Sequence, residues 1–444
     1  MIVRTPVVER LAELAKLGAY EGGIDRGLFS APEHAARMLF ASWARAADLA
    51  LSQDRAGNLF ARRDGMAQRA PILVGSHLDT VRTGGPYDGA YGVVAALCAL
   101  ERLNAEGWAT AHPVEAVAWA GEEGSRFPMG CLGSGAYAGL NSLASIELLA
   151  GDDGERFVDA RDGVNGLLPL VPVRDDFPAP AASLELHIEQ GPIMERAGAR
   201  LGVVTAIAGQ VRAEVEVSGD SGHAGTVPMI VRHDALAAAA EIVLALETLA
   251  RQLGECVATV GHVVVEPNQT NVIPARVTFR LDARSVDDER VDRLEAGLRD
   301  ECSRIEIQRG VKCAVKILER RAAIPMDGRL RAALLETLGS LHAAQHETAG
   351  GLRAAQHETP GGLRAAQRDT HGKSDLKIID IHSGAGHDSM CIATIAPAAM
   401  IFVPSAGGRS HVGNEYTAPE DLELGVEALT RSIVAVDVLL TTFQ

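Results

Sequence analysis

The chain has 444 residues, of which 47% are hydrophobic and 4% aromatic, and its formal net charge at pH 7 is -16. This length exceeds that of one compact core, so we expect a globular protein of two or three domains. The acidic charge and the lack of a basic cluster argue against nucleic acid or an anionic membrane surface as a partner.

The six cysteines are scattered along the chain without a CxxC pair. This distribution is typical of reduced, mostly buried thiols in a cytoplasmic protein. Charged residues interrupt the segment 1–17, which therefore lacks the core of a signal peptide. No apolar run reaches the roughly 18 residues of a membrane span. We expect a cytoplasmic protein.

The first half of the chain alternates helical and strand patterns. The patterns predict a helix at 32–49, strands at 58–62 and 70–74, a helix at 91–106 and a strand at 114–120. Such alternation is typical of an α/β fold with a largely parallel sheet flanked by helices. Ligands of these sheets gather at the carboxyl ends of the strands.

Polar residues follow the second and third of these strands. His77 and then Asp79 come after the second strand, and Asp88 lies in a glycine-rich turn eleven residues beyond His77. The third strand runs into the adjacent carboxylates Glu122 and Glu123. Imidazole and carboxylate groups at strand ends are typical of a metal site, in which one glutamate can bind the metal while the other acts as a base.

The pattern changes after residue 208. Apolar and polar residues alternate at 211–217 and 275–283, and helical patterns occupy 234–252 and 288–304. This order predicts an inserted α+β module, ferredoxin-like in its arrangement, over 209–325.

The first domain, 1–208, would then resume at 326–444. A tandem repeat of eleven residues lies within it, at 342–372. Its histidines, His346 and His357, are compatible with metal binding. We interpret the repeat as a duplicated surface loop, because its Gly-Gly pairs and Pro360 disfavour a helix.

Further segments with polar residues at motif-like spacing follow along the chain. They contain Glu185-Leu-His187-Ile-Glu189-Gln190, Ser221-Gly-His223, Asn268-Gln-Thr-Asn271, Asp282-Ala-Arg284, Gly386-His387-Asp388 and Ser410-His411. Together with the strand-end residues, they resemble the amidase/carbamoylase branch of the M20 metallopeptidase family. That branch comprises the N-carbamoyl-L-amino-acid hydrolases, β-ureidopropionases and allantoate amidohydrolases. The resemblance covers nearly the whole chain.

The resemblance implies a site for two divalent metal ions, which could be zinc, manganese, cobalt or nickel. Asp88 would bridge the two ions, and Asp79 would hold the ring of His77 in the metal-binding tautomer. Glu122 would be the general base. The terminal ligands would be His77, Glu123, His187 and His411.

The resemblance also implies residues that bind substrate. His223 would donate a hydrogen bond to the oxyanion, and Asn271 and Arg284 would hold the substrate carboxylate, with the guanidinium binding it through two parallel hydrogen bonds. Gln190 and His387 would contact the ureido group. The inserted domain would act as a lid and as the dimerisation domain of a homodimer.

The expected reaction is hydrolysis of the ureido C–N bond of N-carbamoyl-L-amino acids, which yields the L-amino acid, carbon dioxide and ammonia. Allantoate also carries ureido and carboxylate groups, so an allantoate amidohydrolase is an alternative. A dipeptidase or aminoacylase would use the same metals. A non-catalytic binding protein would be expected to lack Glu122 or a metal ligand, and all are present.

Two positions depart from the pattern of the relatives. Val227 lies where they often carry threonine, and Gly135 lies where they often carry arginine. Neither change removes a metal ligand, but both leave the shape of the substrate pocket open.

Overall fold

A computed structural model describes residues 5–354 and 376–442, and the side chains of residues 342–354 are not part of this description. The chain forms two compact units. The larger unit comprises Met1–Thr205, Met326–Ile381 and His387–Gln444. The smaller unit comprises Ala206–Pro325 and His382–Gly386, whereas the sequence predicted an insertion at 209–325.

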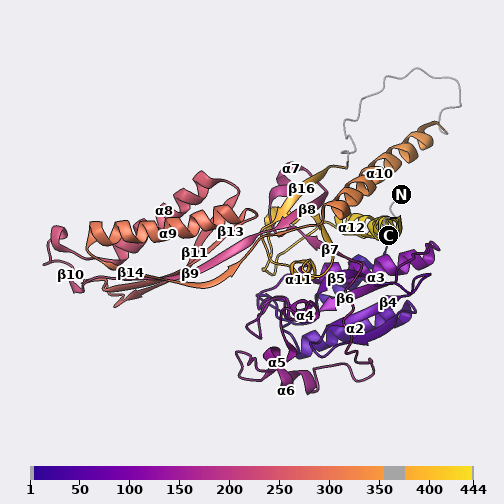
Figure 1. Cartoon of the computed structure of the whole chain (residues 1–444), viewed down its shortest axis with the longest axis horizontal. Helices are drawn as coiled ribbons and strands as arrows, with labels where there is room; N and C mark the ends of the chain where they lie inside the picture. The colour runs from indigo at the N-terminus through magenta and orange to yellow at the C-terminus, as the bar shows by residue number, and fades with distance from the viewer. Residues whose placement is uncertain (1–4, 355–375, 443–444) are drawn as a thin grey trace. The chain divides into compact units, whose positions relative to one another are not determined.

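The main sheet has nine strands in the order β15-β8-β17-β7-β5-β6-β4-β3, with β16 beside β8 (Figure 1). The central strands β17, β7, β5 and β6 are parallel, and the pairs β17–β8, β8–β15, β6–β4 and β4–β3 are antiparallel. The predicted α/β class is confirmed. The strands are β3 Ala50–Gln53, β4 Leu59–Arg63, β5 Ile72–His77, β6 Val114–Trp119, β7 Ala182–Ile188, β8 Leu201–Ile207, β15 Ile324–Pro325, β16 Ile378–Ser383 and β17 Ala398–Val403.

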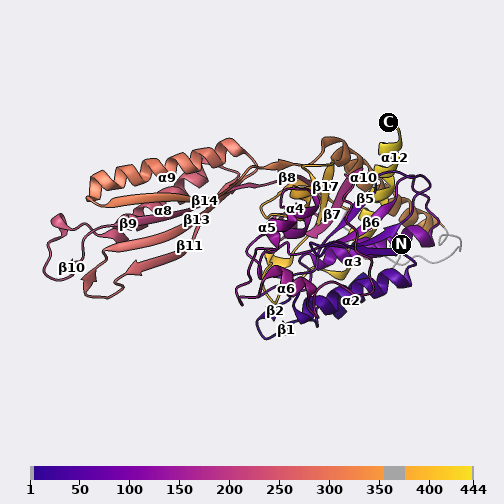
Figure 2. The same cartoon turned by 60° about the horizontal axis from the view of Figure 1, so that its bottom comes forward.

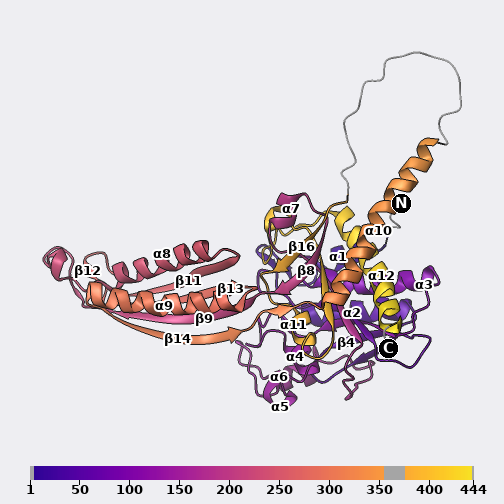
Figure 3. The ribbon, with the colours of Figure 1, turned by 45° about the horizontal axis from the view of Figure 1, so that its top comes forward.

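The central strands of this sheet are buried on both faces, because helices cover each face. One face packs against α1 Val7–Leu14, α2 Ala31–Ala46, α3 Ala90–Ala105, α10 Gly328–Ala354 and α12 Pro419–Thr442. Figure 3 shows α10 beside α12. The other face packs against the short helices α4 Leu132–Tyr137 and α11 Asp388–Ile392.

Short elements connect these layers. They are β1 Ala19–Tyr20, β2 Gly23–Ile24, α5 Leu143–Ile146, α6 Phe157–Asp162, α7 Ile193–Ala197 and the 3-10 turn η2 Ala406–Gly408. Among the described residues, no helix combines the length and the apolar character that crossing a membrane requires.

The smaller unit is a four-stranded antiparallel sheet in the order β11-β13-β9-β14, with α8 and α9 on one face (Figure 2). Its chain order of strand, helix, two strands, helix and strand is the ferredoxin-like arrangement that the sequence predicted. The bounds are β9 Gly209–Ser218, α8 Ala235–Leu253, β11 Cys256–Glu266, β13 Arg276–Ser285, α9 Asp288–Arg309 and β14 Lys312–Arg321. The ladder β10 Gly222–His223 with β12 Val272–Ile273 and the turn η1 Met229–Val231 complete the unit.

Local sequence explains these elements. Asp234 and Asp287 are the N-caps of α8 and α9. The carboxylate of Asp234 accepts two N–H groups of the first turn of α8, and that of Asp287 accepts one N–H of the first turn of α9. Along β13, Val277, Phe279 and Leu281 are buried against the helices. The intervening polar residues therefore lie on the face that carries no helix.

The repeat departs in part from the expectation. We expected a loop at 342–372, but α10 extends to Ala354 and so contains the first copy, Ala343–Arg353. Glycine in a helix interior costs only about 1 kcal/mol relative to alanine, and the copy is rich in alanine, glutamine, glutamate and leucine, which favour a helix. The rest of the repeat, including His357 and Pro360, lies outside the described residues.

Candidate active site

Three parallel strands bring candidate ligands to one edge of the main sheet. His77 is the last residue of β5, His187 is the penultimate residue of β7, and Glu122 and Glu123 follow β6. Because these strands are parallel neighbours, their carboxyl ends meet at the same edge. The register explains why residues 45 or more positions apart in sequence are adjacent.

Asp88 lies at the centre of this group. Its Oδ1 is 3.2 Å from Nε2 of His187 and 3.8 Å from Nε2 of His77. Its Oδ2 is 3.1 Å from Nε2 of His411, which in turn lies 3.4 Å from Oε1 of Glu123. Two groups of potential metal ligands therefore share Asp88: His77 with His187, and Glu123 with His411.

The histidine rings are oriented by backbone carbonyls. The carbonyl of Asp79 is 2.9 Å from Nδ1 of His77, and the carbonyl of Ile188 is 2.9 Å from Nδ1 of His187. A carbonyl only accepts, so Nδ1 carries the proton in both rings. Nε2 is therefore the atom that faces Asp88: it donates to the carboxylate when the ring is protonated, and its lone pair is available to a metal ion when the ring is neutral.

Asp79 is placed differently from the expectation. Its carboxylate lies 3.7 Å from Nδ1 of His77, and the hydrogen bond to that ring comes from its backbone carbonyl instead. The carboxylate accepts hydrogen bonds from the backbone N–H groups of Glu122, at 3.1 Å, and Glu123, at 3.2 Å. Asp79 thus fastens the loop after β6 to the end of β5.

The electrostatics of the group fit cations. Burial, followed by the charge of Glu123, raises the pKa of Glu122 well above its usual value. Burial and the charge of Asp88 raise the pKa of Glu123 to about 7. Divalent cations relieve repulsion of this kind, and carboxylates with imidazoles are ligands that zinc, manganese and related ions accept. The donor set therefore fits the metal ions that the sequence implied.

The neighbouring histidines stabilise the negative charge of the Asp88 carboxylate. Burial alone would raise its pKa, but hydrogen bonds from His187 and His411 hold it well below the usual range. Burial would lower the pKa of His187, yet Asp88 raises it to about 9. The hydrogen bond to Asp88 also raises the pKa of His411 to about 9.

Close packing around the ligands requires glycine at position 89. Gly89 has a φ of +63°, and a Cβ there would lie 2.3 Å from Cε1 of His77. This glycine precedes α3 and allows the His77 ring to approach the backbone beside Asp88.

Gln190 and His387 also lie in this group. Gln190 has a φ of +60°, and its Nε2 donates to Oδ2 of Asp88 at 2.9 Å. Its Oε1 is buried without a hydrogen-bond partner among the described residues. The buried ring of His387 packs edge-on against His187, with 4.6 Å between the ring centroids.

Sequence reasoning assigned no role to two further residues. Oε1 of Glu415 accepts the backbone N–H groups of Tyr87, at 2.9 Å, and Asp88, at 3.0 Å. Ser410 lies between the two carboxylates, with its Oγ 2.7 Å from Oε2 of Glu415 and 3.1 Å from Oδ2 of Asp88. The sequence did offer one indication of their role, because both residues lie within four positions of the candidate ligand His411.

Comparison with known proteins agrees with this geometry. Residues 73–435 match the model of peptidase family M20/M25/M40. An N-carbamoyl-L-amino-acid amidohydrolase of Paenarthrobacter aurescens is 37% identical over 97% of this chain and 97% of its own length. An allantoate amidohydrolase of Bacillus subtilis (strain 168) is 35% identical over 96% of each chain.

A solved structure gives the same result. The amidase of the hydantoinase/carbamoylase family from Burkholderia multivorans superposes with a TM-score of 0.83, at 34% identity and over 97% of each chain. The chain belongs to peptidase family M20, in its hydantoinase/carbamoylase amidase branch. It is a metal-dependent amidohydrolase of the carbamoylase type.

In this M20 amidohydrolase, the smaller unit carries the other predicted residues. His223 in β10 pairs with Val272 of β12, and the carbonyl of Asn271 accepts the N–H of Ala224. Nδ1 of His223 accepts the N–H of Gly225 at 3.0 Å, so Nε2 carries the proton of the neutral ring. The structure therefore brings His223 and Asn271 together.

Arg284 lies elsewhere in the smaller unit. Arg284 is near the end of β13, where it pairs with Gln210 near the start of β9. β10, which contains His223, follows the opposite end of β9. The eight residue steps from Arg276 to Arg284 span roughly 26 Å of extended strand. His223 and Arg284 are thus at opposite ends of the sheet.

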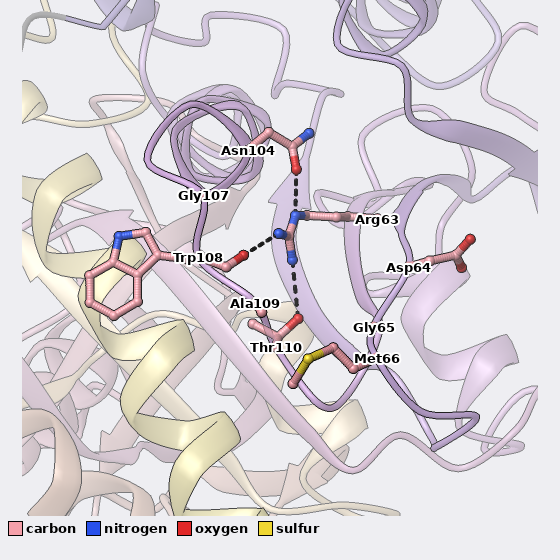
Figure 4. Close-up of a pocket in the computed structure, with 9 residues that line it drawn as sticks. All are labelled: Arg63, Asp64, Gly65, Met66, Asn104, Gly107, Trp108, Ala109 and Thr110. Atoms are coloured by element: carbon pink, nitrogen blue, oxygen red, sulfur yellow. Dashed lines mark hydrogen bonds between the residues drawn. The ribbon is translucent and has the colours of Figure 1, made fainter.

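A pocket of about 330 Å³ in this amidohydrolase lies at the opposite edge of the main sheet (Figure 4). Arg63, at the end of β4, pairs with Val114 at the start of β6. Its guanidinium donates to Asn104, to Thr110 and to the carbonyl of Trp108. This pocket contains none of the predicted site residues.

Proposed function

We propose that this amidohydrolase hydrolyses the ureido C–N bond of N-carbamoyl-L-amino acids to give the L-amino acid, carbon dioxide and ammonia. The observation that carries the proposal is the orientation of Gln190. Its Nε2 is engaged by Asp88, so its buried Oε1 remains as an acceptor. The terminal NH2 of a ureido group can donate to such an acceptor, whereas the carbon chain of an N-acyl group cannot.

Two divalent ions are part of the proposal. His77, His187 and Asp88 would hold one ion, and Asp88, Glu123 and His411 would hold the other. Such ions lower the pKa of bound water and polarise a carbonyl oxygen. The separation of the donors into two groups that share Asp88 supports this assignment.

Glu122 is the proposed general base. It takes a proton from the attacking water, whose oxygen bonds to the ureido carbon. Its raised pKa suits a group that first accepts and later returns a proton. When the C–N bond breaks, Glu122 delivers this proton to the leaving amine. The carbamate that remains decomposes to ammonia and carbon dioxide.

The other residues stabilise and orient the substrate in this proposal. His223 donates from Nε2 to the oxygen on which negative charge develops. Arg284 and Asn271 bind the substrate carboxylate, and His387 with Gln190 contacts the ureido group. The hydrogen bond that Nδ1 of His223 accepts from Gly225 supports the donor role of Nε2.

We also propose that the protein is a homodimer. One small substrate cannot reach both His223 and Arg284, which lie at opposite ends of the smaller unit. The partner subunit's His223 and the partner subunit's Asn271 would then serve this chain's substrate. The edge strand β11 supports an intermolecular contact, because Val257, Val263 and Val264 expose 57%, 52% and 44% of their surface.

Allantoate is the second candidate substrate, because the similar proteins include both carbamoylases and allantoate amidohydrolases. The deciding experiment measures ammonia release from N-carbamoyl-L-amino acids, N-carbamoyl-β-alanine and allantoate. The enzyme is first stripped of metal and then reloaded with manganese, cobalt or zinc. The fastest metal-dependent substrate identifies the activity. Turnover of N-acyl or peptidyl substrates alone, measured separately as release of the free amino acid, would instead identify an aminoacylase or dipeptidase.

A further inference from the structure

The carboxylate of Asp282 lies at the centre of a hydrogen-bond network on the helix-free face of the smaller unit's sheet. Its Oδ1 accepts from Nε of Arg284 at 2.9 Å, and its Oδ2 accepts from Nη2 of Arg284 at 3.0 Å. Oδ2 also accepts from Nε2 of Gln210, at 2.7 Å, and from Nε of Arg212, at 3.2 Å. Four donors therefore fix one carboxylate.

The strand register explains this network. Asp282 and Arg284 are two residues apart on β13, so their side chains lie on the same face. Across the ladder, Asp282 pairs with Arg212 of β9 and Arg284 pairs with Gln210. Direct and diagonal neighbours of this kind are within reach of long side chains.

The network leaves two N–H groups of the Arg284 guanidinium available. Asp282 occupies the edge formed by Nε and Nη2, and the carbonyl of Gly384 accepts from Nη1 at 2.8 Å. These bonds use three of the five N–H groups of arginine, so one N–H remains on each terminal nitrogen. Two N–H groups, one on each terminal nitrogen, can donate to the two oxygens of a carboxylate.

The charge state of Asp282 is consistent with this arrangement. Burial alone would raise its pKa, but the hydrogen bond and charge of Arg284, with those of Arg212, lower it. Asp282 is therefore an anion at neutral pH. Only 31% of its side chain and 28% of the Arg284 side chain are exposed, so the pair is partly shielded from water.

We propose that Asp282 is a positioning residue for substrate specificity: it holds Arg284 by one edge and thereby presents the other edge to the substrate carboxylate. This inference rests on the proposed role of Arg284 as the carboxylate-binding residue. Without Asp282, the guanidinium would sample several rotamers and would have to be immobilised by each substrate. The loss of pre-organisation would then weaken substrate binding and leave the rate of the chemical step unchanged.

The test compares Asp282→Asn with wild type on an N-carbamoyl-L-amino acid and on the matching carboxamide. For the carboxylate, KM should rise between about threefold and about tenfold, which corresponds to one released side chain. The kcat for the carboxylate and the KM for the carboxamide should stay near the wild-type values. Asp282→Glu, which keeps both carboxylate oxygens, should recover part of the loss.

Glu214→Gln is the matched control, because Glu214 pairs with Arg280 at 2.9 Å on the adjacent part of the same two strands. It should leave both KM values unchanged. Arg212→Gln is a second probe, since Arg212 is 47% exposed and contacts Asp282 from the neighbouring strand β9. Arg212→Gln should also raise the KM for the carboxylate substrate, by a smaller factor than Asp282→Asn. It therefore tests the proposal even if Asp282→Asn fails to fold.

Two failures can be distinguished with Arg284→Lys. If this variant affects the carboxylate and the carboxamide alike, Arg284 does not bind the carboxylate, and both the proposed role and the inference are wrong. If Arg284→Lys discriminates between the two substrates but Asp282→Asn and Arg212→Gln do not, only the inference is wrong. If the wild type prefers allantoate, the same comparison is made with allantoate and its amide.

Discussion

The carboxylate of Asp79 accepts a hydrogen bond from the backbone N–H of Glu122 at 3.1 Å. The same carboxylate accepts from the N–H of Glu123, while the backbone carbonyl of Asp79 orients the ring of His77. One residue therefore performs two separate tasks with two separate groups. The side chain places the proposed base, and the main chain places a proposed metal ligand.

Replacing Asp79 by asparagine should separate these tasks. The amide keeps one acceptor but directs a donor at a backbone N–H, so the loop that carries Glu122 loses an anchor. We expect kcat to fall about tenfold to a hundredfold, as for other outer-shell partners. Metal affinity, measured by competition with a chelator, should stay close to that of wild type. A loss of affinity with unchanged kcat in the metal-loaded enzyme would contradict this division.

The adjacent residues Glu122 and Glu123 should give opposite phenotypes. Glu122→Gln removes the base, so kcat should fall by a factor of about 100 to 10,000 while metal binding persists. Glu123→Gln removes a charged ligand and should weaken metal binding instead. Steady-state kinetics and metal titration on both variants test the assignment, and brisk turnover by Glu122→Gln would remove Glu122 as the base.

Metal removal should destabilise the protein. Ions that bind only the folded state add about 2.7 kcal/mol of stability when their concentration is a hundred times the dissociation constant. The melting temperature of stripped enzyme should therefore rise on adding manganese, cobalt or zinc. Asp88→Asn, which alters the shared ligand, is the control and should show little response. An equal response of both proteins would indicate ion binding elsewhere.

Two inactive variants should complement each other if the dimer is organised as proposed. A heterodimer of Glu122→Gln and His223→Ala contains one site with an intact base and an intact partner histidine. Random mixing after dissociation should restore about a quarter of wild-type activity, because half of the dimers are mixed and each has one intact site. Each variant alone, taken through the same procedure, is the control. Absence of recovery in dimers shown to be mixed would indicate that His223 acts within its own chain.

The stability of the fold should depend on pH through Glu33, a buried residue whose carboxylate accepts the N–H of Phe29 at 3.0 Å. Burial raises its pKa from 4.5 to about 7, so the folded state holds the proton more tightly than the unfolded state. The stabilising contribution of the protonated group is fully present at low pH and declines as pH rises from about 4.5 to about 7. Relative to Glu33→Gln, wild type should lose unfolding free energy across this window. Denaturant titrations on both proteins measure the difference, and a constant difference would contradict the prediction.

Much of the fold and the residue types of the site were predictable from the sequence. Alternation at Val277, Phe279 and Leu281 predicted a strand with one buried face, which is confirmed. His77 and Glu123 were expected to meet because both follow strands of one parallel sheet. These inferences depend on local patterns and on one rule of sheet geometry.

The remaining features depend on contacts that a linear pattern does not encode. The separation of His223 from Arg284 follows from the register of β9 with β13. The attachment of Gln190 to Asp88 joins residues about a hundred positions apart. The extension of α10 through the Gly-Gly pair of the first repeat was predicted wrongly, because the helix-favouring neighbours outweighed the glycines.

The pairing of β8 with β15 has a consequence for how the smaller unit could have been acquired. Ile207 and Ile324 are antiparallel partners, so the chain leaves the main sheet and returns to it within one strand spacing, about 5 Å. In the main sheet, residues 208–323 therefore occupy the place of the loop that joins two strands of a hairpin. A short turn joining Ile207 to Ile324 would preserve these pairings of the larger sheet. Exchange of the insertion would therefore replace His223, Asn271 and Arg284 while leaving the candidate metal ligands in place.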